Sequence, residues 1–152
     1  MPKACLLLIA VVFATSPMLA QKALPNSQAD SQIRKLLEQQ VAAWNRHHLE
    51  AFMSGYWHSP ELTFFSGGTT TKGWEPTIQR YQQKYQANGA AMGKLEFSDL
   101  DVVQLAPKAA FATGHWHLTM PDGKHPEGLF TLVLRNFPEG WRIVHDHTSA
   151  AP

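Results

Sequence analysis

The chain has 152 residues, a formal net charge of +1 and a single cysteine. A net charge this close to zero gives no electrostatic attraction for nucleic acid or for an anionic membrane surface, and the length suits one domain with its own hydrophobic core. We therefore expect no nucleic-acid partner and no second domain.

The N-terminus has the pattern of a secretory signal peptide over residues 1–20. Lys3 supplies a positive charge, an apolar run follows at 4–14, and Pro17 breaks that run before the small residue Ala20. The apolar run is shorter than the ~20 residues that a membrane-spanning helix needs. The pattern therefore predicts an exported protein, periplasmic or secreted, that is not held in a membrane after cleavage.

Cleavage at this point would remove Cys5, the only cysteine of the chain. The mature protein would then have no disulfide, no thiolate metal site and no cysteine nucleophile. We expect a flexible lead-in at 21–26 and a single folded domain at 27–150.

The first half of that domain is predicted to be mainly helical. One helix follows a capping pattern at 27–30 and keeps a helical apolar period as far as Trp44. A second, short amphipathic helix covers 49–57, and a third begins near Gly73. A short strand at 62–65 lies between the second and third helices.

The second half is predicted to be antiparallel strands. The first begins at Lys94, with a change of phase near 98–99 that indicates a bulge, and the others cover 110–120, 128–135 and 141–149. Helices followed by a strand meander are typical of an α+β fold, with the helices packed on one face of a curved sheet.

The turns between these strands set a predicted register. A hairpin centred on Asp122 and Gly123, and another centred near Pro138, assign alternate residues to the two faces of the sheet. The first face is predicted to carry Thr113, His115, His117, Phe130, Leu132, Leu134, Arg142, Val144, Asp146 and Thr148. The second is predicted to carry Trp116, Leu118, Leu129, Thr131, Val133, Arg135, Trp141, Ile143, His145 and His147.

Two His-x-His pairs, at 115/117 and 145/147, raise the question of a zinc site. The predicted register places the two pairs on opposite faces of the sheet. One pair supplies too few ligands for zinc, so we expect no metal site; a zinc hydrolase remains the least favoured alternative.

The first face has the composition of a ligand pocket, with an apolar floor and a few polar groups. We expect Asp146 and His117 to act as a base and acid pair. The predicted ligand contacts are Trp57, Tyr81, His115, Phe130, Leu132, Arg142 and Thr148. In an alternative interpretation Arg142 and Asp146 form a structural ion pair, and the aromatic residues only pack the core.

The second face predicts an exposed apolar patch. Its members are Trp116, Leu118, Val133, Trp141 and Ile143. Such a patch is unusual on a monomer, so we expect a homodimer formed through the outer face of the sheet.

Several segments resemble one known superfamily over nearly all of 27–149. They are AWN…F…YWxSPxL, GxTxxG, RYQxxY, ATGHWHL, GxFTLVLR and, most specifically, GWRIVHDHTS. The chain is similar to the SnoaL-like and nuclear transport factor 2-like superfamily, and in particular to an exported branch of unknown function that resembles the calcium/calmodulin-dependent kinase association domain.

This resemblance implies a cone in which three helices close a curved sheet over a pocket, often with a dimer on the outer face. It also implies that the pocket arginines of the kinase association domain correspond to His117, Leu132 and Thr148, so that arginine cluster is absent. SnoaL-like cyclases use an acid/base Asp on the last strand, a part that Asp146 could take.

The sequence therefore predicts an exported domain that binds a small apolar or weakly acidic ligand. It either only binds this ligand or also catalyses proton transfer without a cofactor, as in isomerisation, cyclisation or dehydration. The alternative is a non-enzymatic, dimeric assembly domain, because fold alone does not give function.

Overall fold

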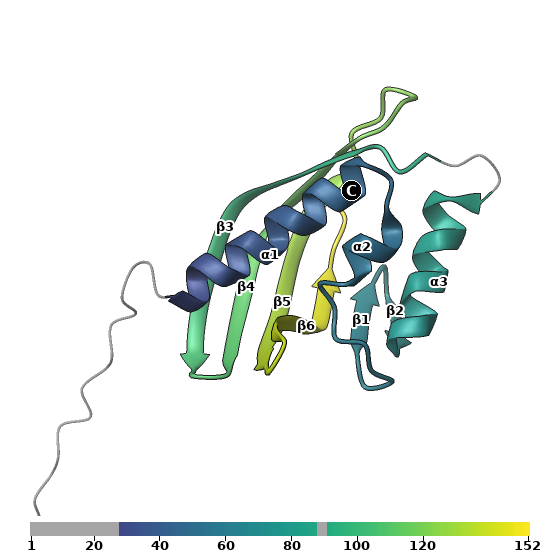
Figure 1. Cartoon of the computed structure of the whole chain (residues 1–152). Coiled ribbons are helices and arrows are strands. Elements are labelled where there is room, and N and C mark those ends of the chain that lie inside the picture. Colours follow the sequence, from purple (N-terminus) through teal and green to yellow (C-terminus); the bar gives the residue numbers. More distant parts are fainter. Residues whose placement is uncertain (1–27, 88–90) are drawn as a thin grey trace, which may run out of the picture.

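The computed structural model describes residues 28–87 and 91–152 (Figure 1), so the predicted signal peptide at 1–20 and the lead-in at 21–26 lie outside the described residues. The described chain forms three helices and six strands. In chain order these are α1 (Gln28–Asn45), α2 (Leu49–Met53), β1 (Thr63–Ser66), β2 (Thr69–Lys72), α3 (Trp74–Tyr85), β3 (Lys94–Ala106), β4 (Ala109–Thr119), β5 (Glu127–Phe137) and β6 (Gly140–Thr148).

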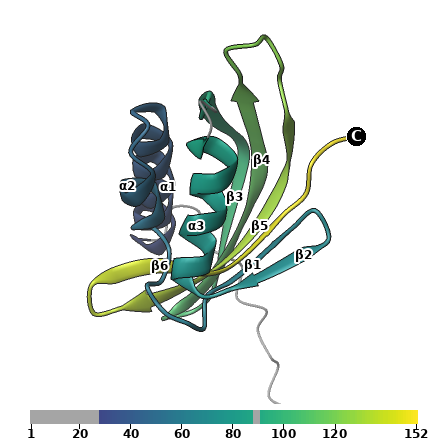
Figure 2. The same cartoon turned by 90° about the vertical axis from the view of Figure 1, so that its right-hand side faces the viewer.

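The six strands form one curved sheet in the order β2-β1-β6-β5-β4-β3. β1 pairs with β6 in parallel, and the other neighbours are antiparallel. Figure 2 shows the three helices on the same side of the sheet. The predicted α+β fold, with helices covering one face of a curved sheet, is confirmed.

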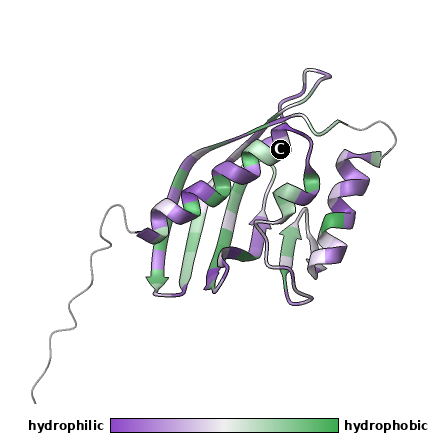
Figure 3. Ribbon diagram, viewed as in Figure 1, coloured by the Kyte–Doolittle hydropathy of each residue, from purple (hydrophilic) through white to green (hydrophobic). Residues whose placement is uncertain are grey.

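The helices are amphipathic, and their apolar sides form the core. Figure 3 shows hydrophobic and hydrophilic segments mixed along both α1 and α3. Ile33 and Leu37 of α1 are almost fully buried, as are Leu134 of β5 and Ile143 of β6. No helix in the described part of the chain is long and apolar enough to cross a membrane.

The second helix is shorter than predicted. It ends at Met53, and the chain then forms an isolated parallel bridge between Tyr56 and Ile143 of β6. Two backbone hydrogen bonds hold this bridge, from the Trp57 N–H to the Ile143 carbonyl (2.9 Å) and from the Ile143 N–H to the Gly55 carbonyl (3.0 Å). As a result Tyr56 points into the interior, where helical continuation was expected.

The bulge predicted near 98–99 is present. The β3–β4 register shifts between Ser98 and Asp101, and Asp99 adopts a positive φ of 51°. A bulge of this kind bends the strand and increases its twist.

The predicted register of β4 against β5 was wrong by one residue. Trp116 pairs with Gly128 and His117 with Glu127, because the Met120 N–H bonds to the Lys124 carbonyl (2.9 Å) and closes a three-residue turn, where a two-residue turn was assumed. A shift of one residue moves every side chain of a strand to the opposite face. Trp116 and Leu118 therefore face the helices, while His115 and His117 face outward.

The predicted faces of β6 are right for 145–148 but wrong for 141–144, because this strand contains an irregularity. Leu134 pairs with Ile143 but Val133 pairs with His145, so Val144 is an extra residue in the ladder. Consequently Ile143 and Asp146 both face inward, although they are three residues apart. Side chains alternate regularly on each side of this bulge, but the alternation changes phase across it, and the prediction assumed one phase throughout.

The shift in β4 places the first His-x-His pair on the outer face, where the second pair also lies, so the prediction that the pairs lie on opposite faces was wrong. On β5, His115 pairs with Leu129, and Thr131 pairs with His147 of the second pair. Within the described residues, no three His, Cys, Asp or Glu side chains come close enough together to hold a metal ion.

The apolar patch predicted for the outer face was also wrong in its composition. Trp141 is 3% exposed, Leu118 is 4% exposed and Ile143 is fully buried in the core, while Trp116 lies beside the helices. Of the five residues only Val133 remains on the outer face. Dimerisation itself stays a prediction.

Candidate functional site

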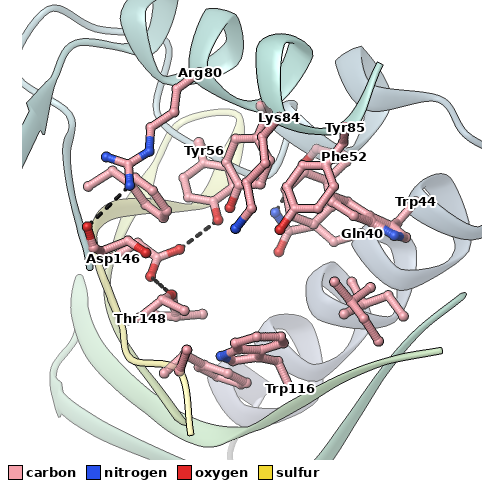
Figure 4. A pocket seen from close by; sticks show the side chains of 18 of the residues that line it. Gln40, Trp44, Phe52, Tyr56, Arg80, Lys84, Tyr85, Trp116, Asp146 and Thr148 are labelled. Carbon is pink, nitrogen blue, oxygen red and sulfur yellow. Dashed lines mark hydrogen bonds between the residues drawn. The ribbon is translucent and has the colours of Figure 1, made fainter. Parts of the chain in front are cut away.

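A cavity of about 290 Å³ lies between the three helices and the inner face of the sheet. This is close to the lower end of the usual size of small-molecule sites. Its walls are strongly aromatic (Figure 4). The aromatic residues that line it are Trp44, Phe52, Tyr56, Phe64, Tyr81, Tyr85, Phe97, Trp116 and Phe130.

The aromatic wall on the helix side is held by ring contacts between three helices. The Trp44 ring of α1 makes edge contacts with Phe52 of α2 (5.1 Å between centroids) and Tyr85 of α3 (4.8 Å). Phe52 in turn contacts Tyr81 at 5.5 Å. The Trp44 indole N–H is fixed by a 3.0 Å bond to the Met92 carbonyl. Offset and edge-to-face contacts of this kind stabilise the rings beyond their burial, so the residues of this wall support one another.

A buried carboxyl group stands on the sheet side of the cavity. Asp146 of β6 is 3% exposed. The Tyr56 hydroxyl donates a 2.7 Å hydrogen bond to Oδ2, and the Thr148 hydroxyl donates one of 2.7 Å to Oδ1 (Figure 4). Each carboxyl oxygen therefore has a hydroxyl partner.

Burial raises the pKa of Asp146 to about 6, and it outweighs the hydrogen bonds from Thr148 and Tyr56, which act in the opposite direction. Desolvation penalises the charged form of an acid, whereas a hydrogen bond to the carboxylate favours it. The group thus titrates near neutral pH, where it can both accept and return a proton.

Two tyrosine hydroxyls accompany this carboxyl group. Burial, followed by the charge of Asp146, raises the pKa of Tyr56 well above its ordinary value. The same two causes, in the same order, raise the pKa of Tyr81. Both tyrosines therefore remain protonated at neutral pH and act as hydrogen-bond donors.

Two basic side chains reach the cavity from α3. Arg80 and Lys84 are four residues apart, so they lie on the same side of the helix. Figure 4 shows both extending from α3 toward the cavity, with the Arg80 guanidinium on the same side of the cavity as Asp146. Arg80 is partly buried, and Lys84 is exposed.

The structure brings together some of the predicted site residues. Those that line the cavity are Asp146, Tyr81, Phe130, Leu132 and Thr148. They come from α3, β5 and β6, and the cavity is the place where these elements meet. Their roles in binding or catalysis stay predictions.

The other predicted site residues lie elsewhere. The Trp57 ring stacks on Phe137, with 5.4 Å between centroids, at the outside of the core. His117 bonds to Glu127 (2.9 Å) and Ser98 (3.1 Å) on the outer face, and His115 stacks on His117. His117 therefore cannot serve as the acid partner of Asp146, and His115 does not line the cavity.

Arg142 is also outside the cavity. It pairs with Arg135 across the strands, and its guanidinium donates to the Trp141 carbonyl at 2.7 Å. No ion pair joins Arg142 and Asp146 in the described chain. The alternative interpretation of these two residues as a structural ion pair was therefore wrong.

Several lining residues escaped the sequence analysis. Tyr56 was missed because the second helix was extended past Met53, with both Tyr56 and Trp57 on its apolar face, and Trp57 was the one chosen for the pocket wall. Trp116 was missed through the register error in β4. Arg80 and Lys84 had a usable signal, since each directly precedes an inward-facing tyrosine, Tyr81 or Tyr85.

Comparisons with known proteins agree with this architecture. A family model described as a SnoaL-like domain matches residues 33–152. The crystal structure of an NTF-2 like protein of unknown function from Shewanella oneidensis MR-1 is 34% identical, covers 79% of this chain and 98% of its own, and superposes with a TM-score of 0.73.

More distant structures show the fold alone. A putative calcium/calmodulin dependent protein kinase II association domain from Xanthomonas campestris is 18% identical, with 86% of this chain and 94% of that chain covered and a TM-score of 0.63. An NTF2-like superfamily protein from Salmonella enterica is 20% identical, covers 82% of this chain and 92% of its own, and has a TM-score of 0.66. No curated protein gives a significant match. The family match and the Shewanella structure together confirm the resemblance found in the sequence: this chain belongs to the SnoaL-like domain family, with an NTF2-like fold.

Proposed function

We propose that this chain is an exported domain that binds a small, largely apolar molecule and transfers a proton to or from it at Asp146. One observation carries the proposal: a buried carboxyl group with a pKa of about 6 stands in the wall of an aromatic cavity. Strongly shifted carboxyl groups in cavities are frequent at catalytic sites.

The neighbours of Asp146 suit proton transfer to carbon or oxygen. Above pH 6 the carboxylate is a base, held in place by Tyr56 and Thr148. The protonated Tyr81 hydroxyl is a hydrogen-bond donor that can stabilise negative charge developing on a ligand oxygen. These groups support isomerisation, cyclisation or dehydration, none of which needs a cofactor.

Exchange of a carbon-bound proton tests the proposal. The chain without residues 1–20 is incubated in deuterium oxide with a panel of enolisable ketones that includes indanone and acetophenone, and proton NMR follows loss of the signal beside the carbonyl. We expect faster exchange with the wild-type protein and a loss of at least about tenfold in Asp146→Asn, within the range for general bases.

Tyr85→Phe is the matched control, since Tyr85 lines the same cavity but does not bond to Asp146. It should keep the exchange rate. If wild type and Asp146→Asn gave equal proton-exchange rates with every ketone that binds, catalysis at Asp146 would be rejected. The domain would then bind a ligand without catalysing a reaction.

The export part of the proposal is supported by the sequence pattern at 1–20. Expression of the full chain in a bacterial host, followed by cell fractionation and intact mass measurement, tests it. We expect a processed chain outside the cytoplasm that lacks Cys5. An unprocessed chain in the cytoplasm would contradict it.

A dimeric assembly domain is the second candidate. It is favoured by Leu129, which is 52% exposed on the outer face of β5, beside His115. Binding and dimerisation are compatible, because the cavity lies between the helices and the inner face of the sheet, and Leu129 lies on the opposite face.

A further inference from the structure

We infer that the ligand of this cavity is a small organic acid, an apolar ring that bears a carboxylate, and that Arg80 and Lys84 bind the carboxylate. The inference rests on the proposed binding function and names the ligand class. It places the anion contact on α3, away from Leu132 and Thr148 on the strands.

The two cations are not neutralised by the protein. Among the described residues that line the cavity, Asp146 is the only acidic one, and its two oxygens accept from Tyr56 and Thr148. Neither Arg80 nor Lys84 belongs to an ion pair within the described residues. Two positive charges therefore stand at an aromatic cavity without an ion-pair partner among the described residues.

Arg80 is held in place for this contact. Its guanidinium donates to the Thr71 hydroxyl and to the Ser66 carbonyl, both at 3.1 Å, and it lies 5.3 Å from the centre of the Phe64 ring. These contacts use two of its five N–H groups, so others remain for a ligand. A fixed guanidinium loses little conformational entropy when it binds a carboxylate.

Lys84 supplies a second, mobile charge. Its ammonium lies 5.0 Å from the centre of the Tyr85 ring, and no carboxylate within the described residues pairs with it. An exposed ammonium on a flexible stem can move to meet an anion. Arg80 would therefore orient the carboxylate and Lys84 would add attraction.

The size of the cavity limits the rest of the ligand. A volume of about 290 Å³ with rings on most walls suits a single apolar ring, and a charged group at the α3 side lets that ring lie toward Trp116 and Phe130. In this position the ligand atoms next to the ligand's own carboxylate come closest to Asp146.

Calorimetric titration with phenylacetate and with its neutral methyl ester tests the inference. We expect the acid to bind about tenfold more tightly than the ester, a ratio that corresponds to about 1.4 kcal/mol. In Lys84→Gln the acid should weaken severalfold and the ester should not change. Lys108→Gln, an exposed lysine at the β3–β4 turn, is the matched control and should change neither.

Arg80→Gln should abolish the preference for the acid, and Arg80→Lys should restore part of it. Circular dichroism confirms the fold of each variant, and the exposed Lys84 keeps the test valid if Arg80 variants fail to fold. Equal affinity of the wild type for acid and ester, or no binding of the acid, overturns the inference. Proton exchange at Asp146 is measured separately, so failure of the proposed catalysis is distinguishable from failure of the ligand class.

Discussion

The Tyr56 hydroxyl and the Asp146 carboxyl group form a buried 2.7 Å hydrogen bond between the segment after α2 and strand β6. Both side chains are almost fully inaccessible. The parallel bridge between Tyr56 and Ile143 fixes this geometry, so the backbone positions the donor and the strand irregularity at Val144 positions the acceptor. The site therefore depends on two departures from regular secondary structure.

Removal of this donor should raise the pKa of Asp146 further. Burial raises it, and the hydrogen bonds from Thr148 and Tyr56 oppose that effect. In Tyr56→Phe we expect a rise from about 6 to about 7, since a hydrogen bond to a charged group is worth more than a neutral one. Carbon NMR of the carboxyl group, assigned with Asp146→Asn, measures the change.

Tyr85→Phe again serves as the control and should leave the titration of Asp146 where it is. An unchanged or lower pKa in Tyr56→Phe would mean that this hydrogen bond does not stabilise the charged carboxylate.

Asp146 should also make stability depend on pH. Its folded pKa of about 6 lies above the ordinary value of 3.8, so the unfolded chain releases this proton first. The contribution is fully present below pH 3.8 and is lost as pH rises through about 6, by about 3 kcal/mol at most.

Urea unfolding of the wild type and Asp146→Asn at several pH values checks this. The free energy of unfolding of the wild type relative to the variant should fall between pH 4 and pH 6 and stay level above. If the free energy of unfolding of the wild type rose relative to that of Asp146→Asn over this interval, the raised pKa of Asp146 would be contradicted.

The sequence was sufficient for most of the elements and for the fold class, because helical period, strand alternation and turn residues are local signals. It did not predict β2, and it made α2 too long. It also identified Asp146, Phe130 and Leu132 as sharing a face. It failed at two places where a single residue changes the register of a strand. The turn before Lys124 and the extra residue Val144 each move the neighbouring side chains to the opposite face of the sheet. Such features depend on hydrogen bonds between segments and leave little trace in hydrophobic pattern.

The absence of a side chain at Gly114 is required for the cavity wall. A Cβ at this position would lie 2.6 Å from Cζ of Phe130 and 3.1 Å from the Ser98 carbonyl. Gly114→Ala should therefore destabilise the fold by about 2 kcal/mol, as overpacking of a core does, and displace the Phe130 ring. Urea unfolding measures the loss.

A double-mutant cycle separates the ring contact from the backbone contact. If the Phe130 ring causes most of the loss, the effects of Gly114→Ala and Phe130→Leu should be less than additive in the double variant. Strict additivity would assign the strain to Ser98.

The outer face offers a different test, of the predicted dimer. Leu118, Trp141 and Ile143 are buried and Trp116 lines the cavity, whereas Leu129 on the outer face is a large apolar residue that is 52% exposed. We expect the chain without residues 1–20 to scatter light as a dimer.

Leu129→Lys should convert that dimer to a monomer, since a charge buried in an interface without a partner is strongly unfavourable. Leu105→Lys is the matched control: Leu105 is 63% exposed, but it lies near the end of β3, at the edge of the sheet. It should leave the dimer intact. A wild-type monomer would reject dimerisation, and a dimer that survives Leu129→Lys would place the interface elsewhere than the centre of the sheet.

Because Leu129 is on the opposite side of β5 from Phe130, the monomeric variant should still bind a ligand in the cavity, which makes assembly and binding separable in one protein.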